Sequence, residues 1–554
     1  MQFSNQLGWC WSKARDGRRN NWMTVAAALL VVLVLTDHLH ARDYVLTIAG
    51  GYRKEGNQAS LEANVLFFQQ ILREQQHHAP RAVDYYFADG FDNDADLQVS
   101  GEPLAITSPA TDVVASLHRR GGPVIEYRNH RVPDIAGALD PQLIRSSLEK
   151  FAERARQGDR LILYVTSHGA AGERPEIYDT SISCWGDKSV SMKELTGWLD
   201  KINPDVPVVL IMAQCYCGGF ANAIFRDGDR EKGLAEHQRV GFFAQQHDLA
   251  AAGCRPDIEN DEEFSSYYWG ALVGHTRNND PMPACDADGD GTVSFSEAYA
   301  NVVVASRTID IPLTTADVLL RTYSSIPDYE LRRTRRRSRR GPPRQPRPDE
   351  EQAGENGDSE DQGDDRDEQD AADENLARMT GPLESLMTDL RPATRRMVVE
   401  LAKQLEFSLT DDVQLVLKAY EDERNGRRQF GPFGRGRRRG PSGRRELLAE
   451  VEEKWPELAD REKWQDSELL RPENQDQLME ELKQLPSYET YATQRKQRAE
   501  QADQAEEAEL REVKLARLIN VLESIVLERN LPLVADPEVV QRFRRMVELE
   551  GMTL

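Results

Sequence analysis

The sequence has few features of membrane, repeat or nucleotide-binding proteins. The one candidate for a membrane span, residues 25–35, holds eleven apolar residues, whereas a spanning helix needs about 20. No other segment could span a bilayer. The chain also has no evident internal repeat and no phosphate-binding glycine loop, so neither a repeat architecture nor a nucleotide site is predicted.

The apolar run at residues 25–35 is typical of an export signal. Basic residues precede it and the small residue Ala41 follows it, so residues 1–41 are predicted to be a cleaved signal. An uncleaved anchor is the alternative. In either case the rest of the chain lies outside the cytoplasm, because positive charge stays on the cytoplasmic side. The protein is then secreted or periplasmic, or else held at the membrane by this segment. The basic residues are Lys13, Arg15, Arg18 and Arg19.

Cysteine is scarce, with six residues in 554. Cys10 would leave with the signal, and an odd number would remain. An oxidising compartment then predicts one free nucleophile and up to two disulfides. Five reduced thiols in a cytosolic protein are the alternative, which requires the signal prediction to be wrong. The remaining cysteines are Cys184, Cys215, Cys217, Cys254 and Cys285.

The charge is strongly negative and unevenly distributed. A formal net charge of −24 argues against a nucleic-acid partner, even though residues 332–340 are almost wholly basic. Acidic residues crowd together at 349–374. Such a segment cannot bury a core, so residues 329–377 are predicted to be a disordered linker. We hypothesise that the basic run is a processing site for trypsin-like enzymes.

Strands alternate with helices in residues 42–328, which are predicted to form one domain. Short apolar runs predict buried strands, and apolar residues at helical spacing predict amphipathic helices between them. This alternation is typical of an α/β sandwich with a mainly parallel sheet. The expected strands are residues 44–49, 84–88, 161–166, 206–212 and 239–244, and the expected helices are 61–72, 141–151, 191–202 and 264–273.

Two of these strands end in a chemically reactive residue. His168 follows the strand at 161–166, and Cys215 follows the strand at 206–212. A capped helix joins the strands, so they are expected to be parallel neighbours. The carboxyl ends of such strands gather functional groups, and an imidazole there could activate a thiol as a nucleophile. The alternative is a structural histidine beside a buried, inert cysteine.

These elements resemble the caspase-like cysteine peptidases, and among them the legumain (asparaginyl endopeptidase) family. The resemblance covers about residues 44–274 and rests on Ser167-His168-Gly169 and Ala213-Gln214-Cys215-Tyr216-Cys217-Gly218. It implies a caspase-like three-layer sandwich. Cys215 would be the nucleophile, His168 the general base, and the backbone amides of Gly169 and Cys215 the oxyanion hole. Cys217 is assigned no catalytic role, since related enzymes often carry serine there.

The sequence departs from legumains at the positions that select the substrate. Ala213 replaces an acidic residue that is usual in the family. Gly56-Asn57 aligns with the Arg-His pair that helps legumains bind the asparagine side chain, so asparaginyl specificity is not implied. Residues 257–263 are acidic and follow the strand that usually borders the cleft. We hypothesise that they favour basic residues near the scissile bond, with a solvated acidic loop as the alternative.

Residues 286–297 match the twelve-residue EF-hand calcium loop at every ligand position. Gly291 permits the sharp turn, and no second such loop is evident. A lone calcium site is expected to stabilise the domain, and we hypothesise that it also raises activity. No organic cofactor is predicted, and the alternative is a solvated acidic loop. The predicted ligands are oxygens of Asp286, Asp288, Asp290, Thr292 (through its carbonyl), Ser294 and Glu297.

Residues 378–554 are highly charged and helical in pattern. Short amphipathic helices are expected around residues 397–405 and 413–416, and a flexible Gly/Arg-rich linker at 424–445. Residues 493–527 predict one long helix whose apolar stripe, formed by Leu515, Leu518, Val521 and Ile525, packs within a bundle or between copies of the chain.

Two functions are compatible with the sequence. The first is an exported cysteine endopeptidase that hydrolyses peptides or proteins through a Cys-His dyad and an acyl-enzyme. The second is a catalytically impaired caspase-like scaffold or binding module that acts through its helical tail. The first requires the sulfur of Cys215 to be free and within proton-transfer reach of His168.

Overall fold

The computed structural model describes residues 43–74, 82–100, 109–118, 125–253, 263–329, 375–430, 443–460, 463–464 and 467–554. The predicted export signal, residues 257–262 of the acidic loop and residues 330–374 of the predicted linker lie outside these ranges. Within the described residues, no helix combines the length and the apolar character needed to cross a membrane.

A six-stranded sheet forms the centre of the fold, with strand order β11-β10-β9-β5-β1-β2. All neighbouring strands in it run parallel except β10 and β11, which are antiparallel. The prediction of a mainly parallel α/β fold is therefore confirmed. The strands are β1 (Asp43–Gly50), β2 (Ala82–Phe87), β5 (Arg160–Ser167), β9 (Val208–Met212), β10 (Arg239–Phe243) and β11 (Leu313–Thr314).

Helices cover both faces of this sheet. The ring of Tyr44 in β1 packs on Phe151 of α4, whereas the ring of Tyr164 in β5 packs on Phe68 of α2. Tyr44 pairs with Leu161, three residues before Tyr164, so the two tyrosines point to opposite faces. The helices of this part are α2 (Ala59–Glu74), α4 (Pro141–Arg154), α5 (Met192–Leu199), α6 (Phe264–Val273), α7 (Phe295–Ala305) and α8 (Thr315–Tyr323).

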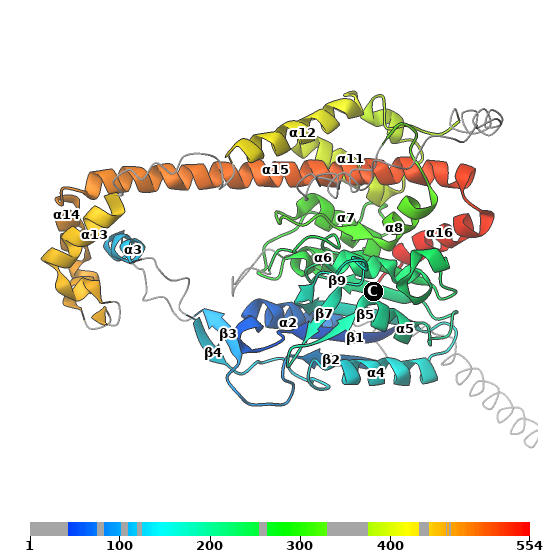
Figure 1. Cartoon of the computed structure of the whole chain (residues 1–554), viewed down its shortest axis with the longest axis horizontal. Coiled ribbons are helices and arrows are strands. Elements are labelled where there is room, and N and C mark those ends of the chain that lie inside the picture. The colour runs from blue at the N-terminus through cyan, green and yellow to red at the C-terminus, as the bar shows by residue number, and fades with distance from the viewer. Residues whose placement is uncertain are drawn as a thin grey trace, which may run out of the picture.

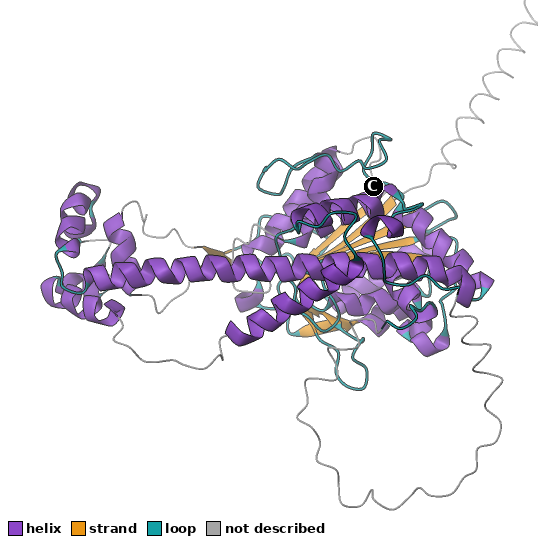
Figure 2. Cartoon of the chain, turned by 90° about the horizontal axis from the view of Figure 1, so that it is seen from above, coloured by secondary structure: helices purple, strands orange, loops and turns teal. Residues whose placement is uncertain are grey.

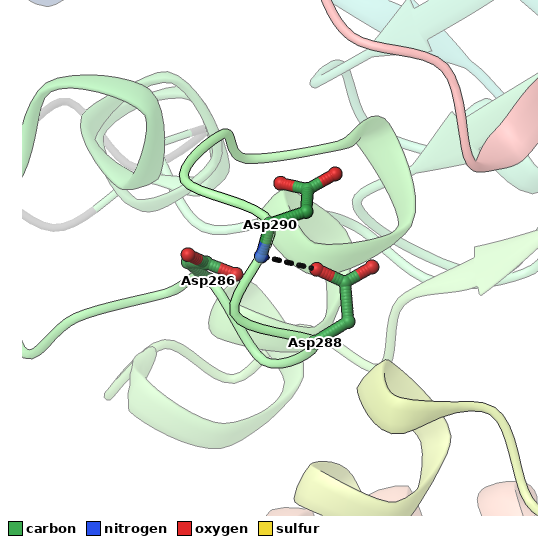
Figure 3. A group of neighbouring side chains, drawn as sticks. All are labelled: Asp286, Asp288 and Asp290. Atoms are coloured by element: carbon green, nitrogen blue, oxygen red, sulfur yellow. Dashed lines mark hydrogen bonds between the residues drawn. The ribbon is translucent and has the colours of Figure 1, made fainter.

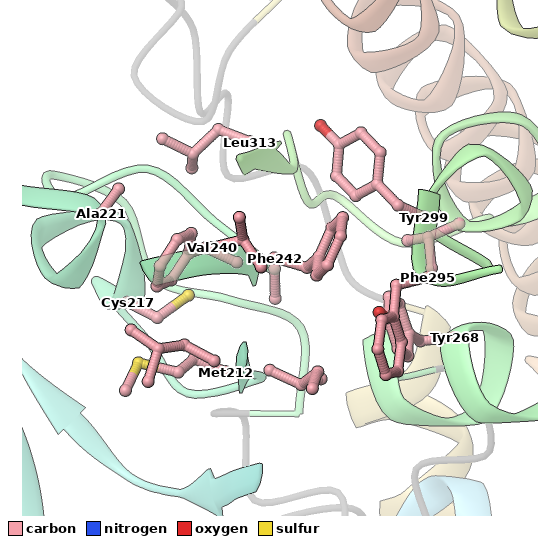
Figure 4. Packing of buried hydrophobic residues seen from close by; sticks show 14 of the residues in the cluster. Met212, Cys217, Ala221, Val240, Phe242, Tyr268, Phe295, Tyr299 and Leu313 are labelled. Carbon is pink, nitrogen blue, oxygen red and sulfur yellow. The ribbon is translucent and has the colours of Figure 1, made fainter. Parts of the chain in front are cut away.

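The core continues from the sheet into α6 and α7. The ring of Phe242 in β10 lies 5.6 Å from Tyr268, 5.7 Å from Tyr299 and 6.3 Å from Phe295 (Figure 4). Val240, two residues earlier in β10, and Met212 at the end of the adjacent strand β9 are both fully buried. This continuous apolar packing fixes the carboxyl ends of β9 and β10, and the candidate site includes the turn that follows β9.

The C-terminal region packs on this α/β part through long helices. The longest, α15 (Tyr488–Val534), has 47 residues and contacts α7, α8, α11 (Pro392–Gln404) and α12 (Val413–Phe430). After it, α16 (Pro537–Glu550) returns to β10 and α8. Figure 2 shows α15 crossing the α/β part and extending beyond it. The predicted helix at 493–527 is confirmed, and its apolar stripe packs within the same chain.

A second, smaller core lies at the far end of α15 (Figure 1). We call it the distal cluster: α3 (Pro109–Leu117), α13 (Gly443–Lys454), α14 (Gln475–Lys483) and the start of α15. The helix α3 belongs to an insertion between β3 (Leu97–Ser100) and β4 (Ile125–Arg128), yet Arg444 of α13 donates to the carbonyl of Leu117 at 3.0 Å. Segments more than 300 residues apart thus share one core.

The predicted Gly/Arg-rich linker at 424–445 is wrong at both ends. Helix α12 continues to Phe430, and α13 already begins at Gly443. Arginine and glutamine are good helix formers, and α12 packs along α15, so the helix extends into a segment whose composition indicated a loop. Residues 431–442 lie outside the described part of the chain.

Candidate functional site

The sheet brings His168 and Cys215 to the same edge. In the pairing of β5 with β9, Val165 is opposite Met212. His168 and Cys215 each lie three residues beyond these partners, so they occupy equivalent positions at the carboxyl ends of neighbouring parallel strands. This is the edge at which α/β sheets carry their functional groups. The helix between the strands, α5, begins with a capping box formed by Ser191 and Glu194, in agreement with the capped helix expected there.

Two oxygen atoms determine which ring nitrogen of neutral His168 carries the proton. Its Nε2 lies 2.8 Å from the carbonyl oxygen of Gly56 and 2.9 Å from Oε1 of Gln58. A backbone carbonyl can only accept, so the neutral ring carries its proton on Nε2 and leaves Nδ1 with the lone pair. Burial lowers the pKa of His168, against the hydrogen bond to Gly56, which raises it. The neutral ring is therefore a base at Nδ1.

Gly169 brings the backbone after His168 against the turn at Cys215. A Cβ atom on Gly169 would lie 2.2 Å from the carbonyl oxygen of Cys215 and 3.1 Å from that of Ser181. No other residue type fits there without moving the backbone. The segments whose amides are expected to form the oxyanion hole are thus side by side.

Cys215 lies in a tight turn that follows β9. Tyr216, the next residue, has the left-handed backbone conformation (φ 61°, ψ 12°), which is uncommon for a bulky side chain and marks a constrained turn. Its amide donates to the carbonyl of Leu249 at 3.0 Å, and that of Gly218 to Gln245 at 2.8 Å. The side chain of Cys215 is almost fully buried. The amide of Ala251 donates to its Sγ at 3.2 Å.

Cys215 is disulfide-bonded, which corrects the prediction that it is the free thiol. Cys184, Cys217 and Cys285, the other cysteines of the described residues, are free and buried. A sulfur in a disulfide has no thiolate and cannot act as a nucleophile. Spacing along the sequence shows that Cys215 is near His168, but it carries no information on the redox state of the sulfur.

Cys217, the other cysteine of the turn, is fully buried. Its Sγ accepts from the amide of Gln245 at 3.3 Å, and burial raises its pKa to about 12. Burial also raises the pKa of Cys184 to about 12. Both are protonated at neutral pH, so neither is suited to nucleophilic catalysis.

The acidic loop at 286–297 brings its first three predicted ligands together. Carboxylate oxygens of Asp286, Asp288 and Asp290 all lie within 4.8 Å of one another (Figure 3). The amide of Gly291, which has φ 91°, donates to Asp286 at 2.9 Å. A hydrogen bond from Asp290 lowers the pKa of Asp288, but desolvation and the neighbouring carboxylates outweigh it and raise the pKa overall.

The remaining predicted ligands close the same loop. Glu297 accepts from the amide of Ala287 at 2.6 Å through Oε1 and from the amide of Ser294 at 2.9 Å through Oε2. Thr292 lies between Asp290 and Ser294 in the sequence, and its amide donates to the carboxylate of Asp290 at 2.8 Å. All donors in this set are oxygen atoms and most are carboxylates, which fits a hard divalent cation such as calcium.

Sequence reasoning missed the residues that orient His168. Gly56 and Gln58 belong to the segment between β1 and α2, about 110 residues earlier in the chain. A backbone carbonyl leaves no side-chain signal, so Gly56 could not have been found. Gln58, a polar residue directly before an amphipathic helix, was the only one of the two that the sequence could have indicated as a partner of His168.

Comparisons with known proteins give no family. No protein-family model matches the sequence, and the search of curated proteins finds no match. Among solved structures, the search finds a match to protein GSU0716 from Geobacter sulfurreducens. The match has 11% sequence identity, covers 50% of this chain and 93% of that chain, and has a TM-score of 0.27.

Proposed function

We propose that this chain is a caspase-like cysteine endopeptidase of the legumain type, held latent by the disulfide at Cys215 and activated by reduction. The observation that carries the proposal is the environment of His168. Its Nε2 is committed to the carbonyl of Gly56, so its Nδ1 is the basic nitrogen, at the strand end beside the Cys215 turn.

The proposed chemistry starts with reduction. A dithiol attacks the disulfide of Cys215 and is itself oxidised, releasing Cys215 as a thiol. Nδ1 of His168 takes the thiol proton, and the thiolate attacks the peptide carbonyl. The amides of Gly169 and Cys215 donate to the developing oxyanion. His168 then protonates the leaving amine, and the thioester is hydrolysed by water with the imidazole as base.

Calcium at residues 286–297 belongs to the same proposal as a stabilising ion. The carboxylates of Asp286, Asp288, Asp290 and Glu297 would hold it, with the Thr292 carbonyl and Ser294 completing the set. When bound, it would neutralise the repulsion between these carboxylates and tie the loop to the start of α7.

The proposed compartment is outside the cytoplasm. Support comes from the basic and apolar pattern of residues 1–41 and from the oxidised state of Cys215. Peptide or protein is the proposed substrate, and neither an organic cofactor nor nucleic acid is required.

Digestion of a peptide library by the full mature chain tests the proposal. We expect cleavage only after treatment with a dithiol, loss of cleavage on Cys215→Ala, and a strong decrease on His168→Ala. Cys217→Ala is the matched control, because that thiol lies in the same turn but is buried and protonated. Equal cleavage by wild type and Cys215→Ala would refute the assignment of the nucleophile.

The disulfide also supports a second candidate function, a caspase-like scaffold in which Cys215 is purely structural. The distal cluster, carried away from the α/β part on α15, would then provide the binding surface. The two functions differ in one result: a scaffold shows no cleavage and no reactive thiol at Cys215 even after complete reduction.

A further inference from the structure

Arg517 is a buried cation of α15 that holds a loop of the α/β part. Its side chain is 1% exposed. Its Nε donates to the carbonyl of Asp310 at 2.8 Å, and its Nη2 to that of Thr308 at 2.9 Å. Its Nη1 donates to the carbonyls of Ser306 at 2.7 Å and Val303 at 3.2 Å.

This arrangement makes the loop and the helix depend on each other. A buried guanidinium is costly unless its donors are satisfied, and here backbone carbonyls of residues 303–310 satisfy them. Burial lowers the pKa of Arg517 to about 10, so the side chain remains charged at neutral pH. Without α15 the four carbonyls would lose these donors, and without the loop the charge would be buried unpaired.

The residues after α7 also bind a second segment, residues 245–252, through hydrogen bonds. The buried carboxylate of Asp310 accepts from the amide of Ala252 at 2.8 Å through Oδ1. Oδ2 accepts from the hydroxyl of Thr308 at 2.9 Å. The amide of Ile311 donates to Oε1 of Gln245 at 3.2 Å. Residues 303–311, which are the end of α7 and the loop after it, therefore hold both ends of this second segment.

The second segment in turn encloses Cys215. Ala251, next to the residue that Asp310 holds, donates its amide to Sγ of Cys215 at 3.2 Å. The carbonyls of Leu249 and Gln245 accept from the amides of Tyr216 and Gly218. A series of direct contacts thus runs from α15 through residues 303–311 and residues 245–252 to the sulfur of Cys215.

We propose that Arg517 is a positioning residue for Cys215, and that α15 is a permanent support of the Cys215 turn. An effect of Arg517 on peptide cleavage rests on the proposed peptidase function. An effect of Arg517 on the accessibility of the Cys215 sulfur does not. Loss of the Arg517 contacts releases residues 245–252 and exposes the sulfur of Cys215 to solvent and reagents. The C-terminal region is then required for a competent site.

The test measures Cys215 directly in the full mature chain. Its disulfide is reduced by a dithiol at fixed potential, and the new thiol is alkylated with iodoacetamide and followed by mass spectrometry. On Arg517→Lys, which keeps the charge but cannot reach four carbonyls, we expect reduction and alkylation at Cys215 to be faster by about ten-fold. Alkylation of Cys184 in the same sample should not change.

Arg321→Lys is the matched control. Arg321 is also buried and also binds α15, through a hydrogen bond to Glu523 at 2.7 Å, but it lies on α8 and makes no hydrogen bond to residues 303–311 in the described structure. Asp310→Asn is a second variant in case Arg517→Lys fails to fold, because it weakens the carboxylate's bonds to Ala252 and Thr308 but keeps the Arg517 side chain. Unchanged rates at Cys215 in Arg517→Lys or in Asp310→Asn, or the same acceleration in Arg321→Lys, would overturn the proposal.

The peptidase assignment is judged separately. If reduced wild type cleaves no peptide while Arg517→Lys still accelerates alkylation of Cys215, the proposed function fails and the positioning role stands. If wild type cleaves peptides, Arg517→Lys is expected to lower kcat more than it raises KM, because Arg517 does not contact substrate.

Discussion

The carbonyl oxygen of Cys215 lies 2.2 Å from the point that a Cβ atom on Gly169 would occupy. Gly169 and Cys215 thus approach closely, and they belong to the two segments on which the proposed chemistry depends. Gly169→Ala must therefore push the backbone after His168 away from the Cys215 turn. We expect a loss of about 1–3 kcal/mol in the free energy of unfolding from the overpacking. A shift of about 1 Å between catalytic groups should also lower peptide cleavage about 100-fold.

Gly197→Ala is the control for that substitution. Gly197 lies in α5, between the same two strands, and a Cβ there would meet no atom within 4 Å. Alanine in a helix interior stabilises by up to about 1 kcal/mol relative to glycine, so the melting temperature should rise slightly and cleavage should be unchanged. Equal activity of the Gly169→Ala and Gly197→Ala variants would show that the close approach at Gly169 is irrelevant.

Calcium should stabilise the protein through residues 286–297. With free calcium at about 100 times its dissociation constant, the expected gain in the free energy of unfolding is about 2.7 kcal/mol. Asp286→Asn should remove most of it, because this side chain is the first ligand and also anchors Gly291. Thermal unfolding with calcium or with a chelator measures the effect.

Asp92→Asn provides the comparison for the calcium experiment. Asp92 lies in another acidic loop, near Asp94, and is exposed, but that loop lacks the rest of the ligand pattern. Its substitution should leave the calcium effect intact. A melting temperature of wild type that is the same with calcium and with chelator would contradict the site.

The pH dependence of cleavage should reflect the environment of His168. Burial lowers its pKa, so the neutral form that acts as a base persists below the ordinary value of about 6.5. In reduced enzyme, the acid limb of kcat/KM is therefore expected below pH 6.5. An acid limb above that value would be inconsistent with the buried, Gly56-bound imidazole.

His237 should make stability depend on pH. Burial, and then the charge of Arg239, lowers its pKa to about 3, and its Nδ1 accepts from Arg239 at 3.2 Å. The folded state thus binds fewer protons than the unfolded state between pH 6.5 and 3. This contribution is present above pH 6.5 and is lost, by about 1 kcal/mol per pH unit, as the pH falls through that window.

Asn at position 237 can still accept from Arg239 but cannot titrate. His237→Asn should therefore show a smaller loss of stability than wild type when urea unfolding is compared at pH 7 and pH 5. Parallel losses in the two proteins would mean that His237 does not remain neutral in the folded state.

Much of the sheet could be predicted from local sequence. The runs that became β1, β5, β9 and β10 are short and mostly apolar, and the first three are rich in β-branched residues. The approach of His168 to Cys215 followed from the βαβ connection alone. These features are encoded within a few residues, or by the handedness of one connection.

The features that sequence could not provide depend on distant partners. Arg517 is one basic residue in a highly charged helix, and nothing nearby shows that it is buried against residues 303–310. The helix α3 finds its core in segments more than 300 residues later in the chain. The disulfide at Cys215 depends on which two sulfurs meet in space, and cysteine spacing does not determine that.

The central claim is that Cys215, once reduced, is a nucleophile served by His168, and one measurement tests it most directly. A thiol-directed peptidyl probe is applied to the mature chain before and after dithiol treatment, and labelling is mapped by mass spectrometry. We predict labelling at Cys215 only after reduction, abolished by Cys215→Ala, strongly slowed by His168→Ala and unaffected by Cys217→Ala. Fully reduced wild type that takes up no probe at Cys215 would contradict the peptidase and favour the scaffold.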